Sequence, residues 1–325
     1  MTTTISGSSG GTAVTTTTLT ALVPPSPPQG RLTLTSATPV LTATVSASAT
    51  VYYALYTGNQ IPIYSGTAWV MTTFTELSNA TAQSSTGNAG PAAVAANSNY
   101  DLFAWSNGGT LTLTRGPPFT SDTVRGTGAG TTQISRVLGI WSNTVAITNG
   151  PGAGLGTYVG TVRSNGTATI DWNPTPASAA GGAVATLGVW NAYNRVPVYA
   201  ASLDSSASWT YTSATWRSAN NSTSNRIQFI VGLAEAAIRA SYQVYSQQSA
   251  ITVWYFGLNL DSTSATPTYY VTQAGASSTL ASEVPAIHYF QSVIGFHYAQ
   301  AMEASNGSNT TNYYGVTKLF LEQLM

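Results

Sequence analysis

The sequence predicts an all-β protein, built mainly of antiparallel β-sandwich or jelly-roll-like domains, with at most one short helical stretch near the C-terminus. From Arg31 onward, β-branched or aromatic residues alternate with polar ones, which is the pattern of half-buried strands. The 325 residues include only ten Lys or Arg and ten Asp or Glu, about a quarter of the usual share of charge. Thr, Ser, Gly, Ala and Tyr cover the surface instead, as is typical of extracellular β-structured assembly proteins.

The first segment, residues 1–29, differs from the rest of the chain. It is a low-complexity run of Thr, Ser and Gly that ends in Pro24-Pro25-Ser26-Pro27-Pro28, a stiff extended stretch with no core of its own. It has neither a basic region nor a continuous apolar stretch, so we expect no signal peptide and no membrane span. We interpret it either as a disordered tail or as an arm that orders against a partner protein.

Residues 30–175 are predicted to form a first β-domain. The hairpin around Asn107-Gly108-Gly109 carries the clearest strand pattern, because two alternating runs flank a glycine turn. Small polar residues predict a loop over 78–97. We expect strands at residues 31–35, 40–45, 50–56, 61–64, 69–74, 100–105, 110–113, 137–141, 145–148, 158–162 and 167–172.

Residues 176–325 are predicted to form a second, C-terminal β-domain. The boundary falls in Asn173-Pro174-Thr175-Pro176 and the following glycines, which exclude a central strand. Strands are expected at 195–200, 208–211, 227–233, 241–245 and 253–260. Residues 282–304 are the one stretch with helical character, although 287–296 also fits a strand.

The charge balance excludes several classes of function. The formal net charge is zero and the pI is near 6.7, so we expect no nucleic-acid binding and no membrane insertion. Cysteine is absent, which excludes disulfides and thiolate-held zinc. Stability must then come from burial within the chain or between chains.

No motif in the sequence points to a cofactor or a metal. The glycine runs 126–130 and 150–154 lack the following helix that a phosphate-binding loop requires, so we interpret them as turns. His288 and His297 are the only histidines, and a spacing of nine does not place them on one helix turn. We expect both to be buried or interfacial, with a metal shared across a symmetry axis left open.

The acidic residues do not form a catalytic pattern. They are scattered singly, no Gly-x-Ser-x-Gly motif is present, and each more often caps a turn or pairs with an arginine. A glycosidase needs two carboxylates facing each other across a cleft, which a sequence does not exclude. We expect no enzymatic activity and assign no catalytic or cofactor-binding residue.

Aromatic residues are the main candidates for contact with a receptor or partner. The chain has 8 Trp and 18 Tyr, most of which a β-domain needs for its core. Those at the surface present flat faces beside hydroxyls, which suit sugar rings or partner proteins. The candidates cluster in the C-terminal half: Trp209, Tyr211, Trp216, Trp254, Tyr269 and Tyr270.

Several strings resemble tail-fibre and receptor-binding-type structural proteins of tailed bacteriophages. They are Thr50-Val-Tyr-Tyr-Ala-Leu-Tyr-Thr-Gly-Asn-Gln-Ile-Pro-Ile-Tyr64, Tyr100-Asp-Leu-Phe103, Arg115-Gly-Pro-Pro118, Arg125-Gly-Thr-Gly-Ala-Gly-Thr131, Gly156-Thr-Tyr-Val-Gly-Thr161, Ser208-Trp-Thr-Tyr211, Ala214-Thr-Trp-Arg217 and Val231-Gly-Leu-Ala-Glu235. The resemblance spans about residues 30–260 and has no catalytic signature. It implies a β-rich, usually homo-oligomeric virion protein on the particle exterior.

We therefore expect a virion structural protein, a tail-fibre, tail-tip or head-fibre subunit that contributes to host attachment and is released by host lysis. A closed homo-oligomer, most often a trimer in such fibres, would bury strand edges and apolar faces. The arm would bind other virion proteins. The surface aromatic residues would bind a polysaccharide or protein of the host surface. The alternatives are a polysaccharide-degrading tailspike enzyme and a bacterial surface adhesin or lectin.

Overall fold

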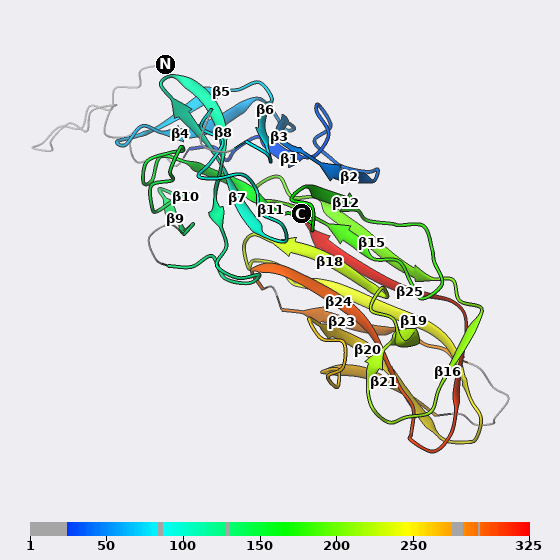
Figure 1. The fold of residues 1–325 in the computed structure, drawn as a ribbon. Helices are drawn as coiled ribbons and strands as arrows, with labels where there is room; N and C mark the ends of the chain where they lie inside the picture. The colour runs from blue at the N-terminus through cyan, green and yellow to red at the C-terminus, as the bar shows by residue number, and fades with distance from the viewer. Residues whose placement is uncertain (1–24, 84–86, 128–130, 275–281, 292) are drawn as a thin grey trace, which may run out of the picture.

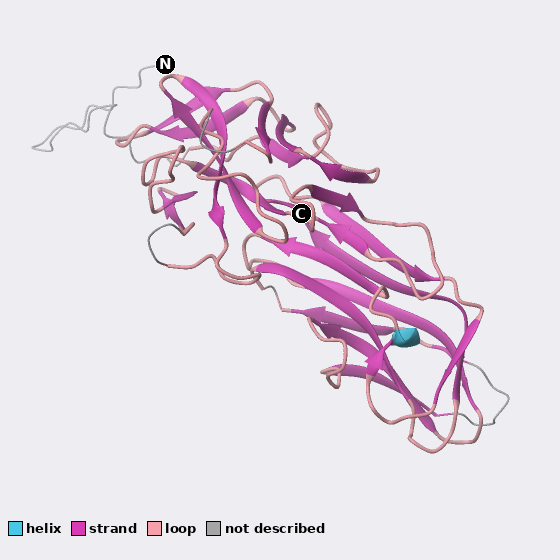
Figure 2. Cartoon of the chain, in the orientation of Figure 1, coloured by secondary structure: helices cyan, strands magenta, loops and turns pink. Residues whose placement is uncertain are grey.

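The chain is essentially all β, as the sequence predicted. The computed structural model describes residues 25–83, 87–127, 131–274, 282–291 and 293–325. Strands make up 52% of the chain and helix 1%, and the one helical element described is the 3-10 turn η1 (Ala219–Asn221) (Figure 2). The molecule is elongated, with the strands of the N-terminal half gathered at one end and a long β-sandwich extending from them (Figure 1).

The N-terminal half contains three small sheets. Their strands pair antiparallel throughout the described residues. One sheet is β1 (Gly30–Thr33), β3 (Thr50–Leu55) and β6 (Leu77–Ala80); the second is the hairpin of β4 (Gln60–Tyr64) and β5 (Trp69–Thr73); the third is β7 (Asn99–Asn107), β8 (Thr110–Pro118), β9 (Ile134–Val137), β10 (Ile140–Asn143), β11 (Thr157–Arg163) and β14 (Val189–Asn191).

The sandwich consists of an eight-stranded sheet packed on a six-stranded one. The eight-stranded sheet is β2 (Val45–Ser48), β12 (Ile170–Asn173), β13 (Ala185–Leu187), β17 (Arg217–Ser218), β18 (Arg226–Val231), β20 (Val253–Leu260), β21 (Tyr269–Ala274) and β24 (Gly295–Ala304). The six-stranded sheet is β15 (Pro197–Asp204), β16 (Ser208–Tyr211), β19 (Ile238–Gln248), β22 (Ser282–Glu283), β23 (Ala286–Phe290) and β25 (Thr311–Leu324). Between them, Tyr242 of β19 meets Phe256 of β20 edge to face at 6.1 Å.

Turn chemistry explains the hairpins and one wrong prediction. Gly108 and Gly109 both have positive φ (55° and 93°), as a two-residue hairpin loop requires, and this confirms the β7–β8 hairpin. The expected strand 137–141 is wrong, because Leu138 and Gly139 take the same positive-φ conformation (48° and 92°) and turn the chain between β9 and β10.

Other segments also differ from the prediction. The loop expected over 78–97 begins with the last residues of β6, and β21 and β25 were not expected. Residues 40–44 precede β2 without forming a strand, and 145–148 lie in a loop where Ile147 N–H donates to the carbonyl of Pro151 (2.9 Å). The helical interpretation of 282–304 is also wrong. This stretch forms β22, β23 and β24, because β24 pairs on both sides, with β18 and β20, and its ladder satisfies the backbone.

One hydrophobic core spans the whole described chain, from Leu32 to Met325. Pro174 and Pro176 lie outside strands, as expected. However, β2 and β12 precede the boundary expected at 175/176 and still extend the eight-stranded sheet that continues after it. Independent folding of the two halves stays a prediction.

The expected arm lies mostly outside the described residues, which begin at residue 25. Its last residue is fixed to the fold, since Gln29 N–H donates to the carbonyl of Gln60 and the Gln29 side-chain oxygen accepts from Gln60 N–H, both at 3.0 Å. The chain therefore enters the fold beside β4, at the opposite end from the sandwich tip (Figure 1). In the described part of the chain, no helix has both the length and the apolar character needed to cross a membrane.

Candidate functional site

Three aromatic side chains meet on the outer face of the eight-stranded sheet near its tip. They are Trp216, which precedes β17, Tyr255 of β20 and Tyr270 of β21. The ring centroids of Trp216 lie 6.2 Å from Tyr255 and 5.3 Å from Tyr270, and the two tyrosines are 5.8 Å apart. We call these residues the aromatic trio. Tyr270 is exposed and the other two are half-buried, so part of the cluster faces solvent.

Strand alternation and one glycine build this trio. Successive residues of a strand point to opposite faces, so Tyr255 faces outward while its neighbour Trp254 faces the core. Gly257 pairs with Tyr270, and a Cβ on Gly257 would lie only 2.9 Å from the Cβ of Tyr270 and 2.7 Å from the Tyr269 carbonyl oxygen. A side chain at position 257 would therefore displace Tyr270.

The structure does not bring the six aromatic candidates together. Trp216 and Tyr270 share the trio, whereas Tyr269 is exposed and stacks on His288 at 4.8 Å, where β21 approaches β23. Trp254 is only 1% exposed and donates its indole N–H to Ser246 Oγ at 2.8 Å. The sequence was wrong to place Trp254 at a contact surface, because the period-two alternation turns it into the core. Its neighbour Tyr255 faces outward instead.

The other two candidates lie inside the end of the sandwich. Trp209 stacks on Tyr313 at 5.3 Å and donates its indole N–H to Glu303 Oε2 at 2.8 Å. Tyr211 lies beneath the guanidinium of Arg217, whose Cζ is 3.7 Å from the ring centroid. Both are half-buried and serve the packing between β16 and β24.

Glu303 is the most perturbed carboxyl group in this region. It is fully buried and accepts from Arg217 Nε and from Trp209, each at 2.8 Å. Burial raises the pKa of Glu303 to about 7, since removal from water disfavours the charged form more than these donors favour it. The group therefore titrates near neutral pH.

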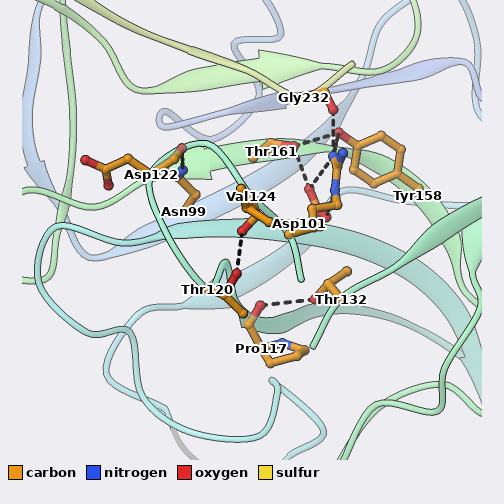
Figure 3. Close-up of polar contacts among 11 residues, drawn as sticks. Asn99, Asp101, Pro117, Thr120, Asp122, Val124, Thr132, Tyr158, Thr161 and Gly232 are labelled. Atoms are coloured by element: carbon orange, nitrogen blue, oxygen red, sulfur yellow. Dashed lines mark hydrogen bonds and ion pairs between the residues drawn. The ribbon is translucent and has the colours of Figure 1, made fainter. Parts of the chain in front are cut away.

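A second buried charge joins the two halves of the chain. Asp101 on β7 is fully buried and accepts from Arg125 Nε at 2.6 Å and Nη2 at 3.0 Å, and from the Thr161 hydroxyl at 2.7 Å. Arg125 also donates to the carbonyl of Gly232, just after β18, at 2.6 Å. Asp101, Thr161, Tyr158 and Gly232 converge there (Figure 3). No local sequence pattern predicts this pairing, because the partners come from separate elements.

The outer face of the six-stranded sheet is uncovered. It carries Tyr199 of β15, Tyr245 of β19, Ile287 and Tyr289 of β23, and Leu324 of β25, all exposed, with 60% exposure at Tyr289. We call this surface the open face. Its charged residues among those described are Lys318 and the ion pair of Arg239 with Glu322 (3.2 Å), placed by the register of β25 with β15 and β19.

The histidines hold no shared site in the described structure. His297 is buried, and its Nδ1 lies 2.6 Å from Asp261 Oδ2, whereas His288 stacks on Tyr269. Among the described residues, no group of three or more His, Cys, Asp or Glu side chains is close enough to hold a metal ion.

Comparison with protein-family models finds no match for this chain, and comparison with curated proteins finds none either.

Proposed function

We propose that this chain is a homo-oligomeric structural subunit on the exterior of a tailed-bacteriophage particle, a tail-fibre, tail-tip or head-fibre component that contributes to host attachment. The open face carries the proposal. The face carries exposed Tyr, Ile and Leu side chains and few charged ones, which is typical of an association surface. A chain with only twenty charged residues has little other means of staying soluble as a monomer.

A second copy of the chain is the partner that fits the open face best. The face is one side of a sheet, and its described charged side chains are one ion pair and Lys318, so the repulsion between two identical faces would be small. The resemblance to phage fibre proteins favours a closed homo-oligomer, most often a trimer. No cofactor and no catalytic residue are part of the proposal.

The placement of the chain ends supports attachment through the arm. Residues 1–29 were assigned to the arm from the sequence, and Gln29 is bonded to Gln60 at the end of the molecule opposite the aromatic trio. An arm that binds other virion proteins there would leave the trio pointing away from the particle, where a host-surface polysaccharide or protein is reached.

The proposal is tested on lysates of the strain whose genome carries this gene. An antibody against the folded chain should decorate the outside of intact particles in electron micrographs. Deleting residues 1–24, which leaves Gln29 in place, should give a folded protein that no longer enters particles. Undecorated particles, with all of the protein free or on the cell surface, would refute the virion assignment and favour the bacterial adhesin.

The tailspike alternative predicts a different result. Incubation of the purified protein with host surface polysaccharide should release no oligosaccharide. Release that is lost when a solvent-accessible carboxylate is changed to its amide would overturn the non-enzymatic assignment, because a glycosidase depends on a pair of carboxyl groups.

A further inference from the structure

A polar groove of about 230 Å³ lies where the N-terminal half meets the eight-stranded sheet. Its floor includes Thr186 of β13 and Gln228 of β18, which pair directly across the two parallel strands. Its wall comes from the turn that follows β11. The principal lining residues are Arg163, Asn165, Asp171, Thr186, Gln228 and Phe296. The groove is separate from the aromatic trio, which lies near the tip of the sandwich.

The wall of the groove is held rigid by its own hydrogen bonds. Asn165 Oδ1 accepts from the backbone N–H of Thr167 (2.9 Å) and of Thr169 (3.1 Å), and Asn165 Nδ2 donates to Asp171 Oδ2 (2.8 Å). Asp171 Oδ1 in turn accepts from Ala47 N–H at 2.7 Å. A ligand would find these groups already positioned and would lose little affinity to ordering them.

Several polar groups in the groove have unused hydrogen-bonding capacity. The side chains of Thr186 and Gln228 form no hydrogen bond with any described residue. Arg163 donates through Nη1 to Asn99 Oδ1 (3.1 Å) and to Asp122, which leaves its Nε–H and Nη2 hydrogens without a partner among the described residues. Phe296 adds an apolar ring, 4.1 Å from Arg163 Cζ. The groove therefore offers donors, acceptors and one flat ring.

The charges in the groove select against an anionic ligand. The positive charge of Arg163 is already balanced by Asp122, so the carboxylate of Asp171 sets the local sign. A ligand that needs donors and acceptors together, carries no negative charge and has an apolar ring face is a neutral sugar. The volume lies below the about 300 Å³ at which sites for drug-sized ligands begin, which limits the occupant to a single ring.

We propose that this groove binds one ring of a neutral saccharide through Thr186, Gln228, Asp171 and Arg163, with the ring face against Phe296. The inference rests on the proposed function, for which it names the receptor chemistry.

The experiment is saturation-transfer NMR on the full-length protein. The neutral probes are the methyl glycosides of glucose, galactose and mannose, and N-acetylglucosamine, each at millimolar concentration; the acidic probe is glucuronate. At least one neutral probe should receive saturation, and glucuronate should receive none. The variants Thr186→Val and Gln228→Leu each remove a polar group that would form a hydrogen bond with the sugar. Each should weaken binding of the sugar about tenfold. Thr272→Val changes an exposed threonine of β21 on the same sheet and should leave binding unchanged.

The inference is overturned if no neutral probe binds, if glucuronate binds in preference, or if both groove variants bind as well as the parent. Melting curves of each variant show whether it is folded, and Thr186→Val keeps a β-branched residue for this purpose. Sedimentation of the same samples distinguishes failure of the groove inference from failure of the proposed function. An oligomer that binds no sugar refutes the groove alone, whereas a monomer that binds sugar refutes the fibre assignment alone.

Discussion

The two outer faces of the sandwich differ in what covers them. On the six-stranded sheet, Tyr199, Ile287 and Tyr289 are exposed, and none of the described segments packs over them. On the eight-stranded sheet, the loop after β20 folds back over the strands, where Asn259 Nδ2 donates to the Ala265 carbonyl at 2.6 Å and Ser218 Oγ to the Thr263 carbonyl at 3.4 Å.

The burial of individual residues follows from this difference. Met302 is fully buried beneath that loop, whereas Ile287 on the open face is 44% exposed. The chain thus covers one face by itself, and the other is the face that we propose a second copy covers. The covered sheet carries the aromatic trio near its tip and the polar groove beside the N-terminal half.

The largest expected effect comes from breaking the contacts of Asp101, Arg125 and Gly232 that attach the N-terminal half to the covered sheet. We call this set of contacts the joint. Asp101→Asn leaves Arg125, which is 10% exposed, without its counter-charge. Removing one partner of a buried pair costs about 3–5 kcal/mol, so we expect a loss of this size in urea unfolding. The matched control is Glu322→Gln on the open face, which breaks an exposed pair and should cost under about 1 kcal/mol. Equal losses would contradict the structural role of the joint.

The next largest effect is a pH dependence of the free energy of unfolding, which we expect from the buried carboxyl group of Glu303 on the covered sheet. Burial raises the pKa of Glu303 to about 7 from 4.5, so the folded chain keeps a proton that the unfolded chain loses between these values. The free energy of unfolding should therefore fall as pH rises from about 4.5 to 7, by up to about 3 kcal/mol, and level off above 7.

The control for this pH effect is the variant Glu303→Gln, which has no proton to lose. Its unfolding free energy, measured by urea denaturation from pH 4.5 to 8, should lack this component of the slope, while Glu322→Gln keeps the slope of the parent. A Glu303→Gln variant with an unchanged slope would show that Glu303 stays ionised throughout.

The smallest effect on stability is expected at the aromatic trio. Trp216→Ala removes two ring contacts from a half-buried position and should cost about 1 kcal/mol. Trp254→Ala in the core beneath should cost about 3–5 kcal/mol. If the trio contacts the host, Trp216→Ala particles should adsorb more slowly than particles with Val70→Ala, at an exposed position on β5. Equal adsorption would remove the trio from the attachment surface.

The sequence predicted the fold class and the β7–β8 hairpin but not which aromatic residues face outward. Alternation and the Gly108-Gly109 turn are local signals, and both appear in the structure. The side of Trp254 and Tyr255 depends on which face of β20 packs on β19, and a single strand does not reveal this. Residues 282–304 looked helical for a similar reason, because only their pairing with β18 and β20 makes β24 a central strand.

The candidate sites were harder to predict than the fold because their parts are distant in sequence. The groove brings Asp171 of β12 near Gln228 of β18 in the same sheet, and Arg125 links Asp101 of β7 to Gly232 just after β18. No periodicity in the chain encodes such a contact. The open face was anticipated only as a charge deficit, and the register of β15, β25, β19 and β23 gathers its exposed residues on one surface.

The most direct test of the account is the mass of the purified protein in solution, measured by sedimentation velocity at micromolar concentration. The parent chain should sediment as a single closed oligomer without appreciable monomer. Ile287→Glu places a charge on the open face and should dissociate it, whereas Val70→Glu, at a 53% exposed position on β5, should not. A parent chain that remains monomeric across this range, or an oligomer that Ile287→Glu leaves intact, would contradict the claim that the open face binds a second copy.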